Sequence, residues 1–122
     1  MITETKTMLT GQRVLLVEDE YFIANDMADQ LEAGGAKVLG PVASVNAAIE
    51  LIEQTERIDW AILDANLLGV KSWPVADALL RRGVRFVFTT GYDSASIPAR
   101  YAEIVRCEKP TTSDMAAKAL FG

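Results

Sequence analysis

The sequence contains no histidine and only one cysteine, Cys107, among its 122 residues. Without histidine, the chain by itself cannot form a Ser-His-Asp triad, a Cys-His pair, an HExxH metal site or a phosphohistidine. A single cysteine allows neither an internal disulfide nor a cysteine-based zinc cluster. Because disulfides are rare in the cytoplasm, a cytoplasmic location is our default expectation.

Long hydrophobic runs and an excess of positive charge are also missing. No apolar run approaches the roughly 18 residues that a membrane-spanning helix needs, and the start of the chain lacks the apolar stretch of a secretory signal. The chain has 12 Lys and Arg against 17 Asp and Glu, which gives a formal net charge of −5. Nucleic-acid-binding proteins concentrate Lys and Arg instead. We therefore expect neither a membrane partner nor a nucleic-acid partner.

Length and composition are those of one globular domain. Half of the residues are hydrophobic and 24% are charged, which is ordinary for a protein with one hydrophobic core. We expect a flexible, polar N-terminal segment at 1–11 and a single folded domain at 12–122. That length leaves no room for a separate output or DNA-binding domain.

Short apolar runs alternate with amphipathic stretches along the chain. The apolar runs predict strands, and the stretches with apolar residues every three or four positions predict helices. We expect residues 65–72 to form a loop and Pro41 to end the second strand. The strict alternation predicts an α/β fold, a doubly wound five-stranded parallel sheet of order 2-1-3-4-5 with about five helices. The predicted strands are 13–17, 37–40, 60–64, 85–90 and 103–108, and the predicted helices are 21–33, 45–52, 74–82, 94–102 and 111–121.

Polar side chains follow four of the five predicted strands. Glu18 and Asp19 come after the first strand, Asp64 ends the third, Thr90 ends the fourth, and Lys109 follows the fifth. Ligands of doubly wound sheets bind at this carboxyl edge. Two carboxylates ~5 Å apart repel each other by roughly 3 kcal/mol at an effective dielectric constant of 20. Such a group needs a cation, a raised pKa of one carboxyl, or both. Carboxylate oxygens suit Mg²⁺ or Mn²⁺.

This combination is what phosphoryl transfer to a carboxylate requires. Asp64 would attack phosphorus, while Lys109 and Thr90 would stabilise charge on the transferred group. Each feature alone has a simpler explanation. An acidic pair often lies on a solvated face, a lone Asp after a strand often caps a helix, and Lys-Pro is a common loop dipeptide. The joint pattern at four strand ends favours the phosphoryl site.

The same stretches resemble a known family. RVLLVEDE, AILDANLLG, FVFTTGY and CEKP are similar to the receiver domain of two-component response regulators, of the chemotaxis single-domain type, over nearly all of the chain after Gly11. LDANLLG and WPVADALLRRGVRFVFTTGYD resemble an alphaproteobacterial subgroup with a Phe-Ala-Thr-Gly-type motif. That subgroup is associated with unusual sensor histidine kinases. The resemblance implies a flavodoxin-like receiver fold, a signalling protein rather than an ordinary enzyme, and a histidine kinase or histidine phosphotransfer protein as partner.

The resemblance also implies a role for residues around the metal. Asp64 matches the phospho-accepting aspartate, and Asp19 matches the direct Mg²⁺ ligand. Glu18 matches the neighbouring acidic residue, which commonly acts through water. Asn66 matches the residue whose backbone carbonyl binds the metal.

Further roles concern the phosphate and the switch. Thr90 matches the switch hydroxyl, and Gly91 would leave room for the phosphoryl group. Lys109 matches the lysine that pairs with phosphate. Arg106 stands where the family usually places an aromatic that swings inward, which predicts a switch that moves the loop after the fourth strand without an aromatic rotamer change. The remaining expected neighbours of the phosphate are Ala65, Tyr92, which lies near the path of attacking water, and Pro110, whose bond to Lys109 is often cis in this family.

Three alternatives stay open. A small phosphohydrolase with an aspartyl-phosphate intermediate usually has a second aspartate two positions after the nucleophile, where this chain has Asn66. A pseudo-receiver that only binds partners would not need the full acidic and lysine set. A flavodoxin-like cofactor binder would need a glycine-rich phosphate loop after the first strand, where VEDEYF stands instead.

Overall fold

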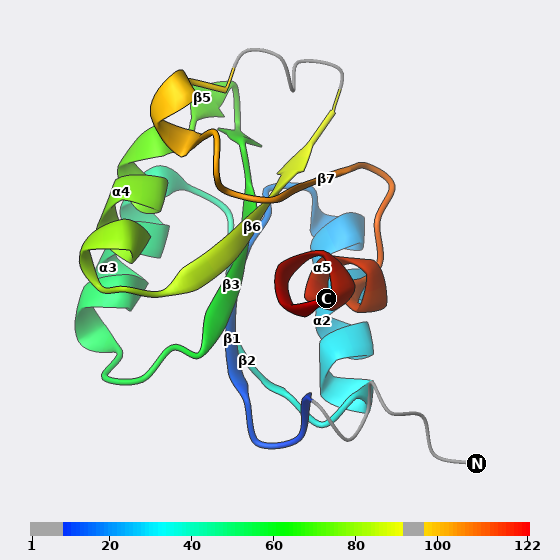
Figure 1. Cartoon of the computed structure of the whole chain (residues 1–122). Coiled ribbons are helices and arrows are strands. Elements are labelled where there is room, and N and C mark those ends of the chain that lie inside the picture. The colour runs from blue at the N-terminus through cyan, green and yellow to red at the C-terminus, as the bar shows by residue number, and fades with distance from the viewer. Residues whose placement is uncertain (1–8, 92–96) are drawn as a thin grey trace.

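A five-stranded parallel sheet forms the centre of the protein (Figure 1). The computed structural model describes residues 9–91 and 97–122. The sheet order is β2-β1-β3-β6-β7, and every neighbouring pair is parallel. Counted along the chain, this is the predicted order 2-1-3-4-5 of a flavodoxin-like receiver fold. The strands are β1 (Arg13–Val17), β2 (Lys37–Val42), β3 (Trp60–Asp64), β6 (Arg85–Thr90) and β7 (Arg106–Glu108).

Helices cover both faces of this sheet. Figure 1 shows α2 (Tyr21–Ala33) and α5 (Ser113–Phe121) on one face, and α3 (Val45–Gln54) and α4 (Trp73–Arg81) on the other. Side-chain caps begin two of them: Ser44 Oγ accepts a hydrogen bond from Ala47 N, and Thr112 Oγ1 accepts one from Met115 N. The described part of the predicted helix 94–102 is instead a 3₁₀-helix, η2 (Ala99–Tyr101), which begins after Pro98.

The core consists of two clusters, one on each face of the sheet. Phe86 and Phe88 belong to the cluster under α3 and α4, whereas Val87 belongs to the one under α2 and α5. This alternation is the ordinary two-residue period of a strand. The two tryptophans are divided in the same way: Trp60 is fully buried in the cluster of α2 and α5, and Trp73 packs against the other cluster.

Besides the helix at 94–102, three local predictions were wrong, and the burial of Leu9 bears on the predicted domain boundary. Pro41 does not end the second strand, because β2 is an edge strand where proline is tolerated, and a register irregularity lies at this point. The predicted strand 103–108 is reduced to β7. The predicted loop 65–72 contains an antiparallel hairpin, β4 (Asn66–Leu67) and β5 (Val70–Lys71). Leu9, inside the predicted flexible segment, is buried in the core.

Candidate functional site

Three carboxylates meet at the carboxyl ends of two neighbouring strands. Glu18 and Asp19 follow β1, and Asp64 ends β3, which pairs directly with β1. One oxygen from each of the three side chains lies within 4.8 Å of the others. Because parallel strands end at one edge of the sheet, their sequence positions were sufficient to predict this acidic pocket.

Lys109 supplies a cation to the acidic pocket. Its Nζ lies 2.5 Å from Asp64 Oδ2 and 3.2 Å from Glu18 Oε1. The backbone fixes the residue, since Lys109 N donates to Thr90 O at 2.8 Å. The Lys109–Pro110 peptide bond is cis, as the resemblance led us to expect. The end of β6 therefore holds Lys109 over the ends of β1 and β3.

The charges in the pocket do not balance. Burial, followed by the charge of Asp64, raises the pKa of Glu18 from 4.5 to about 7. Burial alone would lower the pKa of Lys109, but the hydrogen bond and charge of Asp64, together with Glu18, raise it above 10.5. Lys109 therefore stays charged at neutral pH, while Glu18 is partly protonated there. Glu18 and Asp64 both pair with this one ammonium, and Asp19 lies within the same carboxylate group, which leaves uncompensated negative charge.

Backbone amides fix the orientation of each carboxylate. Asn66 N donates to Asp64 Oδ1 at 3.0 Å, and Glu20 N donates to Glu18 Oε2 at 3.1 Å. Leu68 N, at the tip of the hairpin, donates to Asp19 Oδ2 at 2.9 Å. The β4–β5 hairpin is therefore part of the acidic pocket. Sequence reasoning missed this contact because the hairpin itself was expected to be an irregular loop.

Thr90 ends β6 with its side chain buried. The residue is only 1% exposed, and its Oγ1 has no hydrogen-bond partner among the described residues. Leaving a buried hydroxyl unpaired costs about 1–3 kcal/mol. Thr89 Oγ1 is buried and unpaired in the same way. The Thr90 hydroxyl is thus available to a group that enters the pocket.

Ala65, Gly91 and Arg106 are further predicted neighbours of the phosphate, and each lies in a described part of the chain. Ala65 is buried, and its N–H donates to Thr89 O. A Cβ added to Gly91 would meet nothing within 4 Å, so this position is open. Arg106 is exposed on β7 opposite Phe88. Tyr92 lies outside the described residues.

The donor set of the acidic pocket fits a hard divalent cation. Its ligand atoms are carboxylate oxygens from Glu18, Asp19 and Asp64, and two of these residues are buried. Mg²⁺ prefers a few carboxylates and retains several waters. Three carboxylates meet beside one ammonium, so the pocket carries more negative charge than Lys109 compensates. A divalent cation would supply the missing charge.

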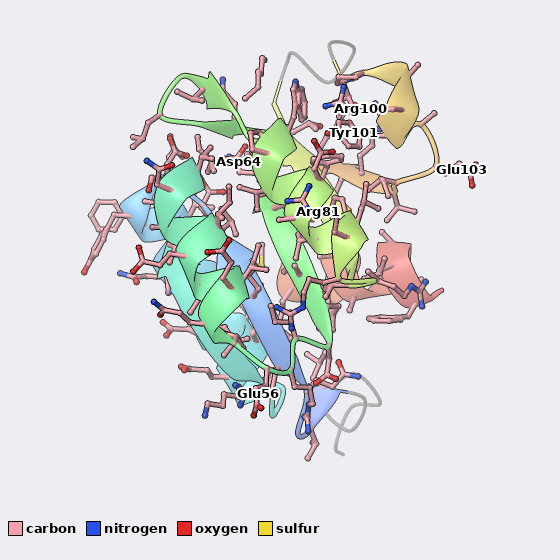
Figure 2. All side chains as sticks on the ribbon, turned by 90° about the vertical axis from the view of Figure 1, so that its left-hand side faces the viewer. Glu56, Asp64, Arg81, Arg100, Tyr101 and Glu103 are labelled. Carbon is pink, nitrogen blue, oxygen red and sulfur yellow. The ribbon has the colours of Figure 1, made fainter. Side chains whose placement is uncertain are left out.

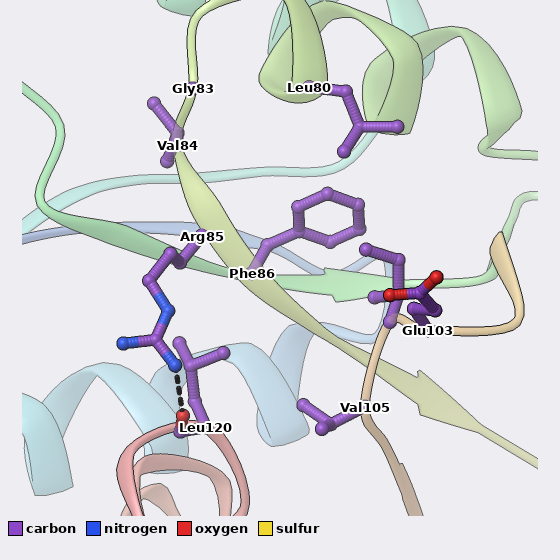
Figure 3. A pocket seen from close by; sticks show the side chains of 9 residues that line it. Leu80, Gly83, Val84, Arg85, Phe86, Glu103, Val105 and Leu120 are labelled. Atoms are coloured by element: carbon purple, nitrogen blue, oxygen red, sulfur yellow. Dashed lines mark hydrogen bonds between the residues drawn. The ribbon is translucent and has the colours of Figure 1, made fainter.

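Of two cavities in the described structure, one adjoins the acidic pocket and the other lies away from it. One of about 160 Å³ adjoins it, and its lining includes Glu18, Lys109 and Thr111. A larger one of about 330 Å³ lies at the amino end of β6, away from the acidic pocket. Figure 3 shows this larger cavity with Leu80, Phe86 and Val105 around it. Its mainly apolar lining offers no carboxylate cluster.

Solved structures similar to this protein include response regulator receivers. SdrG from Sphingomonas melonis Fr1 is 43% identical, with a TM-score of 0.78, over 89% of this chain and 92% of that one. The BeF3-activated conformation of SdrG from Pseudomonas melonis Fr1 is also 43% identical, with a TM-score of 0.73, over 88% and 92%. A response regulator receiver protein from Sinorhizobium medicae WSM419 is 24% identical, with a TM-score of 0.75, over 89% and 90%. No family model and no curated protein matches the chain.

The fold, the acidic pocket and these similar structures all indicate the same family. The chain belongs to the receiver domains of response regulators, the signalling proteins of two-component systems. In the parts of the chain described, residues 9–91 and 97–122, no helix has the length and apolar character to cross a membrane.

Proposed function

We propose that this protein accepts a phosphoryl group on Asp64 from a phosphohistidine and passes on the signal by protein contact, or acts as a phosphate shuttle or sink. The observation that carries this proposal is the arrangement of Asp64 between the ammonium of Lys109 and the carboxylates of Glu18 and Asp19. The chain has no histidine. A sensor histidine kinase or a histidine phosphotransfer protein must therefore supply the phosphorylated imidazole.

The transfer is a substitution at phosphorus. A carboxylate oxygen of Asp64 forms the new P–O bond while the P–N bond to the donor imidazole breaks, and the electron pair stays on that nitrogen. Lys109, already next to Asp64, would pair with a phosphoryl oxygen. The unpartnered hydroxyl of Thr90 would donate to another. Both interactions strengthen as charge accumulates on the transferred group.

We infer that Mg²⁺, or Mn²⁺, is the cofactor. Asp19 and Asp64 would bind it directly, Glu18 through water, and Asn66 through its backbone carbonyl. When bound, such an ion neutralises phosphoryl oxygens and so lowers the barrier to attack by a carboxylate. The convergence of three carboxylates supports this cofactor. A beryllofluoride-activated form of the 43% identical SdrG supports a phosphate-responsive site.

Incubation with acetyl phosphate and Mg²⁺, followed by intact-mass measurement, tests the acceptor. We expect a gain of one phosphoryl group in the wild type and in Asp29→Asn, a control on the exposed surface of α2. We expect no gain in Asp64→Asn or when the metal is chelated. A gain that persists in Asp64→Asn would refute the assignment of the acceptor.

The same preparation separates the alternatives. Steady release of phosphate from small esters would instead favour the phosphohydrolase. No mass gain together with no Mg²⁺ binding would favour a pseudo-receiver that only binds partners. A bound flavin would give the purified protein a visible absorption band, so a colourless protein excludes the cofactor-binding alternative.

A further inference from the structure

An aromatic cluster joins three elements next to the end of β6. Tyr101 of η2 is fully buried, with its ring centroid 5.7 Å from that of Phe88 in β6 and 5.6 Å from that of Trp73 in α4. The rings of Trp73 and Phe88 are 5.7 Å apart and edge to face. Each of the three rings therefore contacts the other two. Nothing in the apolar periodicity of the sequence pointed to Tyr101.

Polar contacts fix the position of the Tyr101 ring. Its hydroxyl donates to Asp77 Oδ1 at 2.5 Å and lies 3.3 Å from the carbonyl oxygen of Trp73. Arg100 holds the same carboxylate at 3.6 Å and places its guanidinium 4.5 Å from the centre of the Tyr101 ring. Tyr101 and Arg100 lie together beside α4, at about the height of Asp64 along the sheet (Figure 2). The hydroxyl thus attaches η2 to α4.

The cluster shares a face of β6 with Thr90. Phe86 and Phe88 both belong to the core cluster under α3 and α4. Because side chains alternate along a strand, Thr90 points to the same face as Phe88, and Thr89 points to the opposite one. Thr89 indeed lines the smaller cavity with Met27 and Thr111, on the side of α2 and α5. Thr90 and Phe88 are therefore neighbours on one face of β6, separated along the strand by Thr89 alone.

We propose that Tyr101 couples the position of Thr90 to helix α4: its ring transmits the movement of Phe88, and its hydroxyl passes that movement to Asp77. This proposal rests on the proposed function only for its trigger, a phosphoryl group on Asp64 that attracts the unpaired Thr90 hydroxyl. The surface that changes is then the one formed by η2 and the amino-terminal half of α4. Tyr101 acts through Phe88 and touches no reacting atom, so it is a positioning residue.

A pair of adjacent threonines provides a test that needs no phosphate. Thr90→Val and Thr89→Val make the same near-isosteric change at two buried residues with unpaired hydroxyls, on opposite faces of β6. We expect two-dimensional NMR spectra to show larger amide shifts at Asp77 and Tyr101 for Thr90→Val than for Thr89→Val, because Thr90 shares the face of Phe88. Combining Thr90→Val with Tyr101→Phe should reduce the shift at Asp77 by more than half. Equal shifts from both threonines, or an undiminished shift with Tyr101→Phe, would overturn the coupling.

A second experiment adds beryllofluoride, which mimics a phosphoryl group, together with Mg²⁺ to the full chain. We expect Tyr101→Phe to bind the mimic within about twofold of the wild type, because the hydroxyl lies outside the acidic pocket, while the response of the α4 amides falls by more than half. Tyr21→Phe, which removes a hydroxyl from a 72% exposed tyrosine, should keep the full response. A full α4 response in Tyr101→Phe contradicts the proposal. Failure of the wild type to bind the mimic would refute the proposed function instead, and the threonine pair would still decide the coupling.

Discussion

The raised pKa of Glu18 predicts that the stability of the metal-free protein depends on pH. The pKa of Glu18 is about 7 in the folded state against 4.5 as the ordinary value, because burial and Asp64 disfavour its charged form. Between these values the folded state binds more protons than the unfolded state, so the free energy of unfolding falls as pH rises from about 4.5 to about 7. The shift corresponds to a loss of about 3 kcal/mol. The contribution is fully present below pH 4.5.

Urea denaturation in a chelating buffer at pH 5 and pH 8 measures this effect. We expect Glu18→Gln to remove most of the pH dependence, because a glutamine does not titrate. Glu20→Gln, a change at an exposed neighbour, should leave it in place. If wild type and Glu18→Gln lose the same stability over this range, Glu18 is not the responsible group.

Some residues of the site could be predicted from the sequence, and others could not. Glu18, Asp19, Asp64 and Lys109 each follow a strand, and the carboxyl ends of parallel strands necessarily share an edge. The bond between Tyr101 and Asp77 depends on the path of the segment before β7, which no periodic pattern specifies. The roles implied by resemblance for the individual site residues stay predictions until phosphoryl transfer is measured.

Helix α3 ends against a side chain from the end of α4. The guanidinium of Arg82 donates to the carbonyl oxygens of Ile52, Thr55 and Glu56, at 2.5, 2.9 and 2.9 Å. The last carbonyls of a helix lack intrahelical partners, and hydrogen bonds to a charged donor contribute about 1.5–3 kcal/mol. We expect Arg82→Ala to lower the free energy of unfolding by about 1–3 kcal/mol in urea denaturation. Arg81→Ala, at the adjacent exposed arginine, should change it by less than about 0.5 kcal/mol; an equal loss in both would show that the carbonyl bonds are not responsible.

Elements with a clear period were predicted at their observed bounds, and the hairpin was not. The apolar runs at β1, β3 and β6 are unambiguous because these strands are buried on both faces, and the stripe of α2 is clear because one helix face is buried. The hairpin turns at Leu68 and Gly69, both with positive φ, 53° and 80°. A two-residue hairpin turn requires such angles, but they are usually met by Asn or Gly, so Leu68 gave no turn signal.

At the scale of the whole molecule, the proposed metal site predicts that a divalent cation stabilises the fold. An ion that binds only the folded state adds free energy by mass action, about 2.7 kcal/mol at 100 times its Kd. For a domain of this length that is a rise in Tm of about 10 °C. We expect Mg²⁺ to raise the Tm of the wild type, and of Asp29→Asn, over a Na⁺ solution of equal ionic strength. The rise should largely disappear in Asp19→Asn; a Tm equally insensitive to Mg²⁺ in all three proteins would contradict a metal site in the pocket.

The division of the two tryptophans between the faces of the sheet gives the protein two separate optical probes. Trp60 is enclosed on the side of α2 and α5 and donates its indole N–H to Gln12 Oε1 at 2.8 Å, whereas Trp73 is half-buried against Tyr101 and Phe88. Their fluorescence therefore arises from environments of different polarity. A chain that retains only the indole of Trp73 emits from the α4 side alone, so light from one residue can follow that layer in real time without an attached dye.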